Sequence, residues 1–293
     1  MKTGKKEWLY FSPRFEYEKE FGDLSSAWEG HRYFIYDFIR NTKPKLIVEL
    51  GTYKGGSLFA MAQAIKDSGL QCKLLGVDTW KGDRHTGFYG NQVFSLVNEI
   101  KRKIYNDQNI VLKKKSFDMA ITRIKNGTVD ILHIDGLHTY KAVKHDFKNW
   151  RVKVKKDGVI LFHDIQEKKG DFQVYRLWNE LKKKFDYLDF YHSHGLGLIF
   201  LNENNDNVVR FREIWRKYYS LQYKYSLSRK QASKELIKIN FLLEINSQLK
   251  SEKINLLSEV LPLRNEVEEL INSRFFRLWQ NYNKLKKKIF ATL

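Results

Sequence analysis

The glycine turn at residues 45–57 constrains the fold more than any other stretch of this chain. Its letters, KLIVELGTYKGGS, describe a buried strand at 46–50, a turn that contains Gly51 and Gly55, and a helix that starts near Ser57. A strand, a glycine turn and a helix start form a cradle for nucleotide-type ligands, because glycine lets a ligand approach the backbone closely. The spacing matches neither the dinucleotide fingerprint nor the phosphate loop. Glu49 favours a cationic or hydroxyl-bearing ligand, and the alternative is a tight strand–helix connection without a ligand.

Size and composition exclude several classes of protein. A chain of 293 residues with 42% hydrophobic content can form one large domain, or one domain and an extension. No apolar run reaches the ~18 residues of a membrane span, and the start MKTGKKEWLYF lacks the apolar core of a secretory signal. Cys72 is the single cysteine, so it is interpreted as a core thiol of a cytoplasmic protein. The net charge of +19 favours anionic surfaces, but no nucleic-acid motif accompanies it.

Apolar runs alternate with helical patterns from residue 28 to residue 201. The expected strands are 46–50, 73–77, 110–112, 129–134, 159–162, 187–192 and 197–201. The last two can pair as an antiparallel hairpin. Because continuous apolar strands separated by helices belong to sheets that are covered on both faces, we expect a doubly wound, mostly parallel α/β sheet. This domain, with a helical lead-in, occupies residues 1–202.

The remainder of the chain is predicted to be helical. A polar linker at 203–207 precedes a tail at 208–293. An approximate coiled-coil spacing there is interrupted by Glu252 and again by Pro262; its apolar residues are Leu242, Ile245, Leu249, Leu256, Val260 and Leu261. The stretch 274–293 contains no acidic residue and has an apolar face formed by Leu278, Trp279, Tyr282, Leu285 and Ile289. This basic amphipathic helix suits an anionic membrane surface, or it packs on its own domain or in a dimer.

Polar residues follow four of the predicted strands, at the edge where doubly wound sheets bind ligands. They are Glu49, Gly51 and Tyr53; Asp78, Thr79 and Trp80; Asp135, Gly136 and His138; and His163 with Asp164. An acid at the position of Asp78 can accept hydrogen bonds from both hydroxyls of a ribose. His133 lies inside a strand and is interpreted as a core histidine.

The acids and histidines of strands four and five allow two interpretations. Asp135, His163 and Asp164 could hold a hard or borderline divalent ion, since they combine oxygen donors with one imidazole. In the alternative, Asp135 and Asp164 bind substrate hydroxyls directly. His138 can serve as a general base, because the ordinary pKa of histidine lies near neutrality.

A series of motifs resembles the class I S-adenosylmethionine-dependent methyltransferases. The motifs are VELGTYKGGS, GVDTWKGDRHTGFYG, DILHIDGLHTYKAVKHDF, GVILFHDI and HSHGLGLIFLN, and they cover residues 28–202. The resemblance is greatest to the subgroup found in bacterial surface-polysaccharide gene clusters. It implies a seven-stranded sheet with S-adenosylmethionine bound by Glu49, Gly51, Gly55, Ser57 and Asp78. The other strand-end residues expected at the cofactor are Tyr53, Thr79, Trp80 and Asp135.

The same resemblance implies roles for the residues after strands four and five. In related metal-dependent O-methyltransferases, the positions that match Asp135, His163 and Asp164 hold magnesium. The position of the catalytic base falls on His138, where those enzymes carry a lysine. His163 likewise replaces a carboxylate.

We therefore expect an enzyme that transfers a methyl group from S-adenosylmethionine to a hydroxyl of a sugar or glycan in surface-polysaccharide biosynthesis. Asp135 and His138 would be catalytic, with Mg²⁺ or another divalent metal as a second cofactor. The protein would be cytoplasmic, at the inner face of the membrane, and would self-associate through its tail. The alternatives are methylation of a non-sugar small molecule, or a non-catalytic scaffold tethered to the membrane.

Overall fold

The structure, a computed structural model, describes residues 8–24, 26–202 and 206–290. In this part of the chain, a seven-stranded sheet has the spatial order β5-β2-β1-β6-β7-β9-β8. Its strands are β1 (Leu46–Leu50), β2 (Lys73–Asp78), β5 (Ile110–Lys114), β6 (Val129–Ile134), β7 (Val154–His163), β8 (Asp186–Phe190) and β9 (Leu196–Phe200). Two short strands, β3 (Gly82–Asp83) and β4 (Gly87–Phe88), pair separately in the loop after β2.

The strand directions confirm the predicted doubly wound sheet. Strands β5, β2, β1, β6 and β7 run parallel, whereas β9 pairs antiparallel with both β7 and β8. The order reverses between β1 and β6, so the crevice at their carboxyl ends is the expected ligand site. Backbone hydrogen bonds extend past both strand ends: Gly51 N–H donates to the Val77 carbonyl at 2.9 Å, and Asp135 N–H donates to the Leu50 carbonyl at 2.8 Å.

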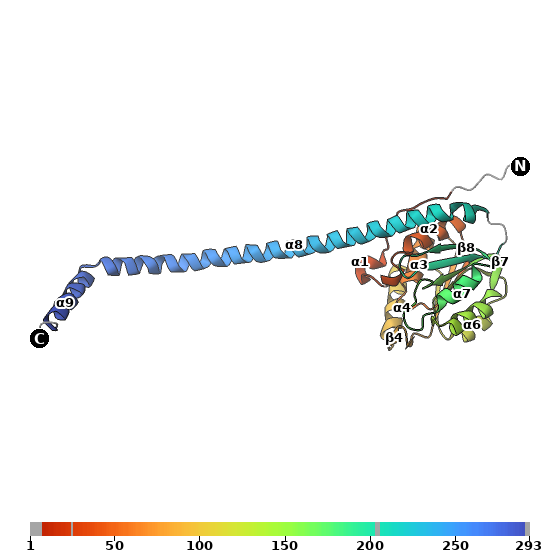
Figure 1. Ribbon diagram of the computed structural model, residues 1–293, viewed down its shortest axis with the longest axis horizontal. Helices are drawn as coiled ribbons and strands as arrows, with labels where there is room; N and C mark the ends of the chain where they lie inside the picture. Colours follow the sequence, from red (N-terminus) through yellow and green to blue (C-terminus); the bar gives the residue numbers. More distant parts are fainter. Residues whose placement is uncertain (1–7, 25, 203–205, 291–293) are drawn as a thin grey trace. The chain divides into compact units, whose positions relative to one another are not determined.

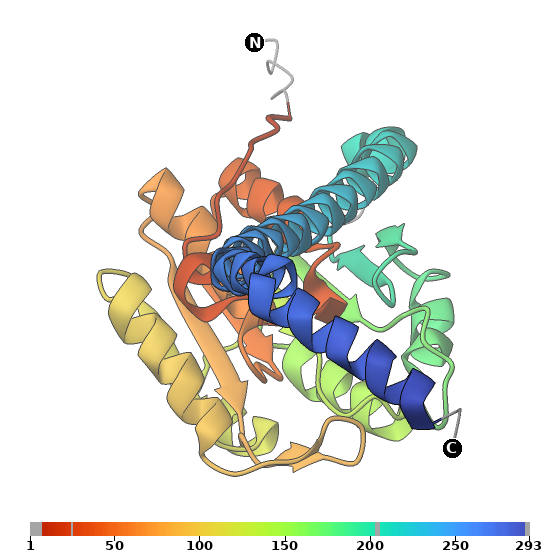
Figure 2. The same ribbon diagram turned by 90° about the vertical axis from the view of Figure 1, so that its left-hand side faces the viewer.

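Helices cover both faces of the sheet (Figures 1 and 2). One layer contains α2 (Arg32–Thr42), α3 (Gly56–Ser68) and α4 (Gln92–Ile104); the other contains α5 (Phe117–Ala120), α6 (Tyr140–Arg151) and α7 (Val174–Leu181). Neighbouring residues of one strand enter different layers, because side chains alternate along a strand. Ile47 therefore packs in the core with α2 and α3, and Val48 packs in the core with α6 and α7.

The lead-in contains two short helices, α1 (Tyr17–Phe21) and the 3-10 helix η1 (Ser26–Trp28). Another 3-10 helix, η2 (Ile121–Arg123), follows α5. Trp28 is buried and directs its indole N–H to the carboxylate of Asp135. The lead-in is thus part of the core and of the site.

The chain divides into two compact units, Met1–Ser226 and Leu227–Leu293. The first unit ends later than the predicted residue 202, because the start of α8 (Asp206–Asn272) packs into its core. Trp215 and Tyr219 are buried there, and the Tyr219 hydroxyl donates to Asp37 Oδ2 at 2.6 Å. The predicted linker at 203–207 falls partly on residues 203–205, which lie outside the described residues.

The second unit contains the remainder of α8 and the helix α9 (Arg274–Phe290). The tail is helical, as predicted, and α8 continues through Pro262, where the coiled-coil spacing was expected to be interrupted. Proline removes one N–H from the hydrogen-bond ladder, and here the residues on both sides keep the helix.

Helix α9 matches the predicted helical segment. Leu278, Trp279 and Tyr282 are exposed on it, whereas the side chains of residues 285–290 lie outside the described ones. Among the described residues, no helix is long and apolar enough to cross a membrane. Contact of α9 with an anionic membrane surface stays a prediction.

Candidate active site

The glycine turn after β1 is held in place by the carboxylate of Asp78. Asp78 Oδ2 accepts hydrogen bonds from the backbone N–H groups of Thr52 and Tyr53 at 3.0 and 2.9 Å, and Oδ1 accepts one from Trp80 at 2.7 Å. Gly51 has φ +91°, and a Cβ there would lie 1.9 Å from the carbonyl oxygen of Asp135. Only glycine fits this position, which brings the ends of β1 and β6 together.

Glu49 lies beneath this turn and is fully buried. Its Oε1 accepts a hydrogen bond from the Ser57 hydroxyl at 2.5 Å and lies 3.1 Å from His133 Nδ1. Glu49 therefore links β1, β6 and the start of α3. Its predicted direct contact with the cofactor stays a prediction. His133 is buried, as expected of a core histidine.

Two cavities meet at Asp135 and His138, which line both of them. The smaller, about 220 Å³, is bordered by Asp78, Thr79 and Phe117. The larger, about 530 Å³, is bordered by Ser57, His163 and Asp164 among others. The two cavities also share the turn residues Gly51 and Tyr53. Trp80 is buried and supports the turn, since its indole N–H donates to the Tyr53 carbonyl at 2.9 Å.

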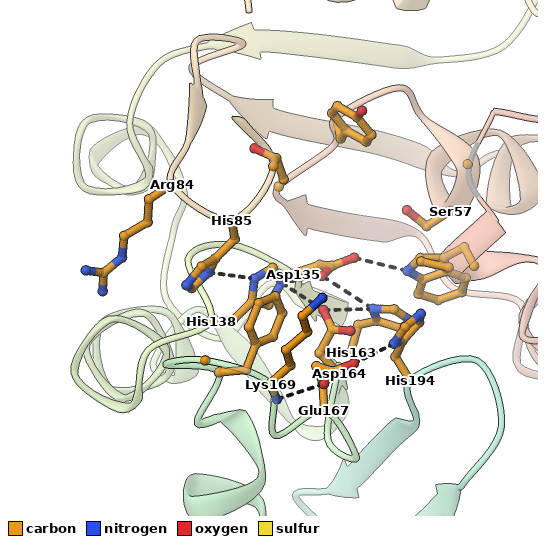
Figure 3. Close-up of a pocket in the computed structure, with 18 of the residues that line it drawn as sticks. Ser57, Arg84, His85, Asp135, His138, His163, Asp164, Glu167, Lys169 and His194 are labelled. Atoms are coloured by element: carbon orange, nitrogen blue, oxygen red, sulfur yellow. Dashed lines mark hydrogen bonds and ion pairs between the residues drawn. The ribbon is translucent and has the colours of Figure 1, made fainter. Parts of the chain in front are cut away.

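Carboxylates and histidines from the ends of β6 and β7 converge where the cavities meet (Figure 3). His138 Nε2 lies 2.8 Å from Asp164 Oδ2 and 3.4 Å from Asp135 Oδ1. His163 Nδ1 lies 3.3 Å from Asp164 Oδ2 and 3.6 Å from Asp135 Oδ1. The indole of Trp28 donates to the other oxygen of Asp135 at 3.1 Å.

The ion pairs determine the protonation of this cluster. Burial alone would raise the pKa of Asp135, but the charge of His163 and hydrogen bonds from His138 and His163 hold it well below its ordinary value. Burial lowers the pKa of His138, but hydrogen bonds to Asp135 and Asp164 outweigh it and raise the pKa to about 9. His138 is therefore protonated at neutral pH in this arrangement. It can act as the predicted base only after its contacts with the two carboxylates change.

The donor set fits a divalent cation. Ligand atoms of Asp135, His138 and Asp164 all lie within 4.8 Å of one another. Two carboxylates and one imidazole suit a hard or borderline ion. His138 joins this group in place of the predicted His163, whose Nε2 makes no hydrogen bond to the residues that the structure describes. The metal itself stays a prediction.

A third histidine, His85, extends the cluster along the wall of the larger cavity. His85 Nδ1 lies 3.2 Å from His138 Nδ1, and His85 Nε2 lies 2.6 Å from Asp171 Oδ1. The ring of Phe172 stacks on both imidazoles, with centroid distances of 4.4 and 4.6 Å. Arg84 forms an ion pair with Asp171 at 2.5 Å. The loops after β2 and β7 are thus joined across the cavity.

Three residues at the site were not predicted from the sequence: Trp28, Asp171 and Phe172. Trp28 precedes the first strand, and the other two lie several residues beyond the end of β7. The segment GDF at 170–172 was a weak signal, because a glycine followed by an acid and an aromatic is common in loops. The structure also places the buried ring of His31 5.5 Å from that of His163.

Stability should fall as pH rises, because the pKa of His138 is raised from 6.5 to about 9 in the folded chain. A proton held more tightly by the folded state stabilises it fully below pH 6.5, and this contribution is lost as pH rises through 9. The shift corresponds to at most about 3 kcal/mol. Urea unfolding with a chelator at pH 6.5 and 9.5 measures the loss.

His138→Gln should reduce this pH dependence, although His163, whose pKa is also raised, should preserve part of it. The matched control is His145→Gln, since His145 is exposed and pairs with Asp118 away from the cavities. Equal free energies of unfolding at both pH values in the unmodified chain would contradict the prediction.

Comparisons with known proteins agree with this geometry. The family described as a methyltransferase domain matches residues 48–165. The chain is 38% identical over 186 residues to an uncharacterized protein of Sinorhizobium fredii. The aligned region is 62% of this chain and 20% of that protein. It is 33% identical over 159 residues to an uncharacterized protein of Acanthamoeba polyphaga mimivirus, covering 52% of this chain and 67% of the viral protein. This chain thus spans only a fifth of the rhizobial protein.

Among solved structures, a candidate caffeoyl-CoA O-methyltransferase of Staphylococcus aureus superposes with a TM-score of 0.50 and 13% identity, over 64% of this chain and 92% of that one. This likeness shows the fold. The sheet order and the glycine turn at the switch point define a Rossmann-like methyltransferase fold. The chain belongs to the methyltransferase-domain family.

Proposed function

We propose that this chain is an S-adenosylmethionine-dependent O-methyltransferase that acts on a hydroxyl of a sugar or glycan intermediate. The observation that carries the proposal is the position of Asp135, His138 and Asp164 where the two cavities meet. A cofactor in the smaller cavity and an acceptor in the larger would have their reacting atoms beside this cluster. Alignment of two reactants in this way supplies a large part of catalysis.

The residues around the smaller cavity fit the proposed cofactor. Helix α3 starts at Gly56, on the wall of the adjoining larger cavity, without a side-chain cap, so its first N–H groups can donate hydrogen bonds to a carboxylate such as that of a methionine moiety. The cofactor would then extend from the smaller cavity into this part of the larger one. Asp78 borders the smaller cavity, but its oxygens already hold the turn. Ribose hydroxyls would therefore share the remaining lone pairs of Asp78. When bound, S-adenosylmethionine supplies a methyl group on a sulfonium centre, whose positive charge Asp135 can stabilise.

The acidic cluster would orient and deprotonate the acceptor. Asp135 and Asp164 can accept hydrogen bonds from an acceptor hydroxyl and direct its oxygen toward the smaller cavity. We assign proton removal to His138, on the condition that acceptor binding displaces its contacts with the two carboxylates. Should a divalent cation bind, Asp135, Asp164 and His138 would hold it, and it would lower the pKa of the bound hydroxyl.

The wall of the larger cavity supports a polyhydroxylated acceptor. Arg84, Glu167 and Lys169 offer charged hydrogen-bonding groups, and the ring of Phe172 supplies an apolar surface. Figure 3 shows Lys169 extending over the cavity. Mixed polar groups with an aromatic face suit a sugar, and a non-sugar small molecule is the alternative. A non-catalytic scaffold would have no need for the buried cluster.

Calorimetric titration with S-adenosylmethionine, in magnesium and then in a chelator, tests the cofactor. We expect micromolar binding, weakened about 10- to 100-fold in Asp78→Asn because a charged partner of the turn and of the ribose is lost. Asp118→Asn is the control, since Asp118 pairs with His145 on the exposed side of α5. Absence of binding in both conditions would favour the scaffold.

The acceptor is tested by release of S-adenosylhomocysteine. We expect release to depend on sugar nucleotides or glycan oligomers. Release only with phenolic acceptors would overturn the sugar assignment while leaving the methyltransferase assignment intact.

A further inference from the structure

Leucines recur every seven residues along the second half of α8. They are Leu242, Leu249, Leu256, Leu263 and Leu270. The residues three positions before these leucines are Ile239, Asn246, Lys253, Val260 and Val267. Because α8 continues through Pro262, the two sets form one seam from residue 239 to residue 270. The approximate spacing described above shares Leu242, Leu249 and Leu256 with this seam, but it passes through Glu252.

The seam is a heptad pattern, with the leucines at position d and the other set at position a. The five leucines are between 53% and 66% exposed in the single chain. An apolar stripe that repeats every 3.5 residues winds helices around each other in a left-handed supercoil and is buried by doing so. The seam is about 47 Å long at 1.5 Å per residue, which is more than four heptads.

We propose that residues 239–270 form a parallel, in-register, two-stranded coiled coil with a second copy of this chain. Leucine at d with β-branched Ile239, Val260 and Val267 at a favours two parallel strands. Two of the five a positions are polar, Asn246 and Lys253. Asn246 can bond its own counterpart only when the two helices are in register, whereas Lys253 lowers the stability of the pair. This inference does not depend on the reaction of the first unit.

The charges beside the seam also select the parallel arrangement. In a parallel pair, Glu259 at position g faces Arg264 at position e of the other helix. Arg264 already lies 3.3 Å from Glu268 on its own helix, and a guanidinium has donors for both acids. An antiparallel pair would instead bring the g positions together, so that Glu252, Glu259 and Glu266 of one helix would face the same residues of the other. Like charges there would destabilise the pair.

Two double variants of the full-length chain test the seam. Leu249→Lys with Leu256→Lys places charges on it, whereas Ile254→Lys with Leu261→Lys places the same charges elsewhere on the helix. The four residues are similarly exposed in the single chain, at 57%, 60%, 65% and 54%. Sedimentation equilibrium should give twice 35.0 kDa for the unmodified chain and the control, and 35.0 kDa for the seam variant. A monomeric or trimeric unmodified chain, or equal behaviour of the two variants, would overturn the proposal.

Cross-linking tests the orientation. Leu242→Cys and Leu270→Cys lie about 42 Å apart along the helix. A parallel in-register pair predicts that each variant alone forms disulfide-linked dimers under mild oxidation. The unmodified chain is the control, since Cys72 is buried. Cross-links found only when the two variants are mixed would show an antiparallel pair and overturn the proposal.

Discussion

Asp135→Asn should slow methyl transfer by roughly 10²- to 10⁴-fold, the range for loss of a group that takes part in proton transfer. Asp135 lines both cavities, and its neighbours hold its pKa well below the ordinary value, so it is ionised at neutral pH. Asparagine has nearly the same shape and keeps an acceptor for the Trp28 indole, but it has no charge for the sulfonium centre or for His138. The rate is measured as acceptor-dependent release of S-adenosylhomocysteine.

The control for this change is Asp118→Asn, which also neutralises an aspartate paired with a histidine but at an exposed position. Its rate should equal that of the unmodified chain. The His138 signal in NMR should meanwhile titrate at a lower pH in Asp135→Asn than in the control, since one of its two acidic partners is neutral. A rate within threefold of the unmodified chain would remove Asp135 from the catalytic residues.

Gly51→Ala should lower the free energy of unfolding by about 3 kcal/mol and abolish cofactor binding. The new Cβ would lie 1.9 Å from the carbonyl oxygen of Asp135 and 2.6 Å from its carbonyl carbon, at a residue with φ +91°. Both contacts are with backbone, so relief requires the ends of β1 and β6 to separate. For a domain of this size the loss corresponds to a decrease in Tm of about 6–12 °C, measured by thermal denaturation.

The control variant Gly127→Ala measures the cost of the left-handed backbone conformation without a steric contact of the new Cβ. Gly127 has φ +64°, but a Cβ there meets nothing within 4 Å. The free energy of unfolding of Gly127→Ala should therefore fall by only about 1 kcal/mol, because alanine is strained in the left-handed backbone conformation. Equal losses in the two variants would show that the contact with Asp135 has no effect of its own.

Most of the fold was predictable because local patterns encode it. The apolar runs of β1, β2 and β6 are continuous, and a strand of this kind is buried on both faces wherever it lies in the sheet. The strand ends were also predictable, since Glu49, Asp78 and Asp135 directly follow or end such runs. The end of the first unit was not predictable, because Tyr219 is buried against α2 and β8, and Trp215 packs on Trp8 of the lead-in.

The sequence indicated several residues of the candidate site, but not the contacts between their side chains. Asp135 and Asp164 were expected to lie together, as parallel strands end at one edge. The candidate cation site contains His138 instead of the predicted His163. This difference depends on the directions of the side chains, which the position of a residue along its strand does not specify. Trp28 and Asp171 reach the site from segments far from the strand ends, so no local spacing marks them.

The sequence by itself determined the alternation of strands and helices, the need for glycine after β1 and the acids at the sheet edge. These follow from near-neighbour sterics and periodic burial, which act within a few residues. Only the tertiary structure decided which histidines contact Asp135 and Asp164 and that Glu49 lies beneath the turn. Such contacts join residues distant in the chain, and the packing of whole elements sets their distances.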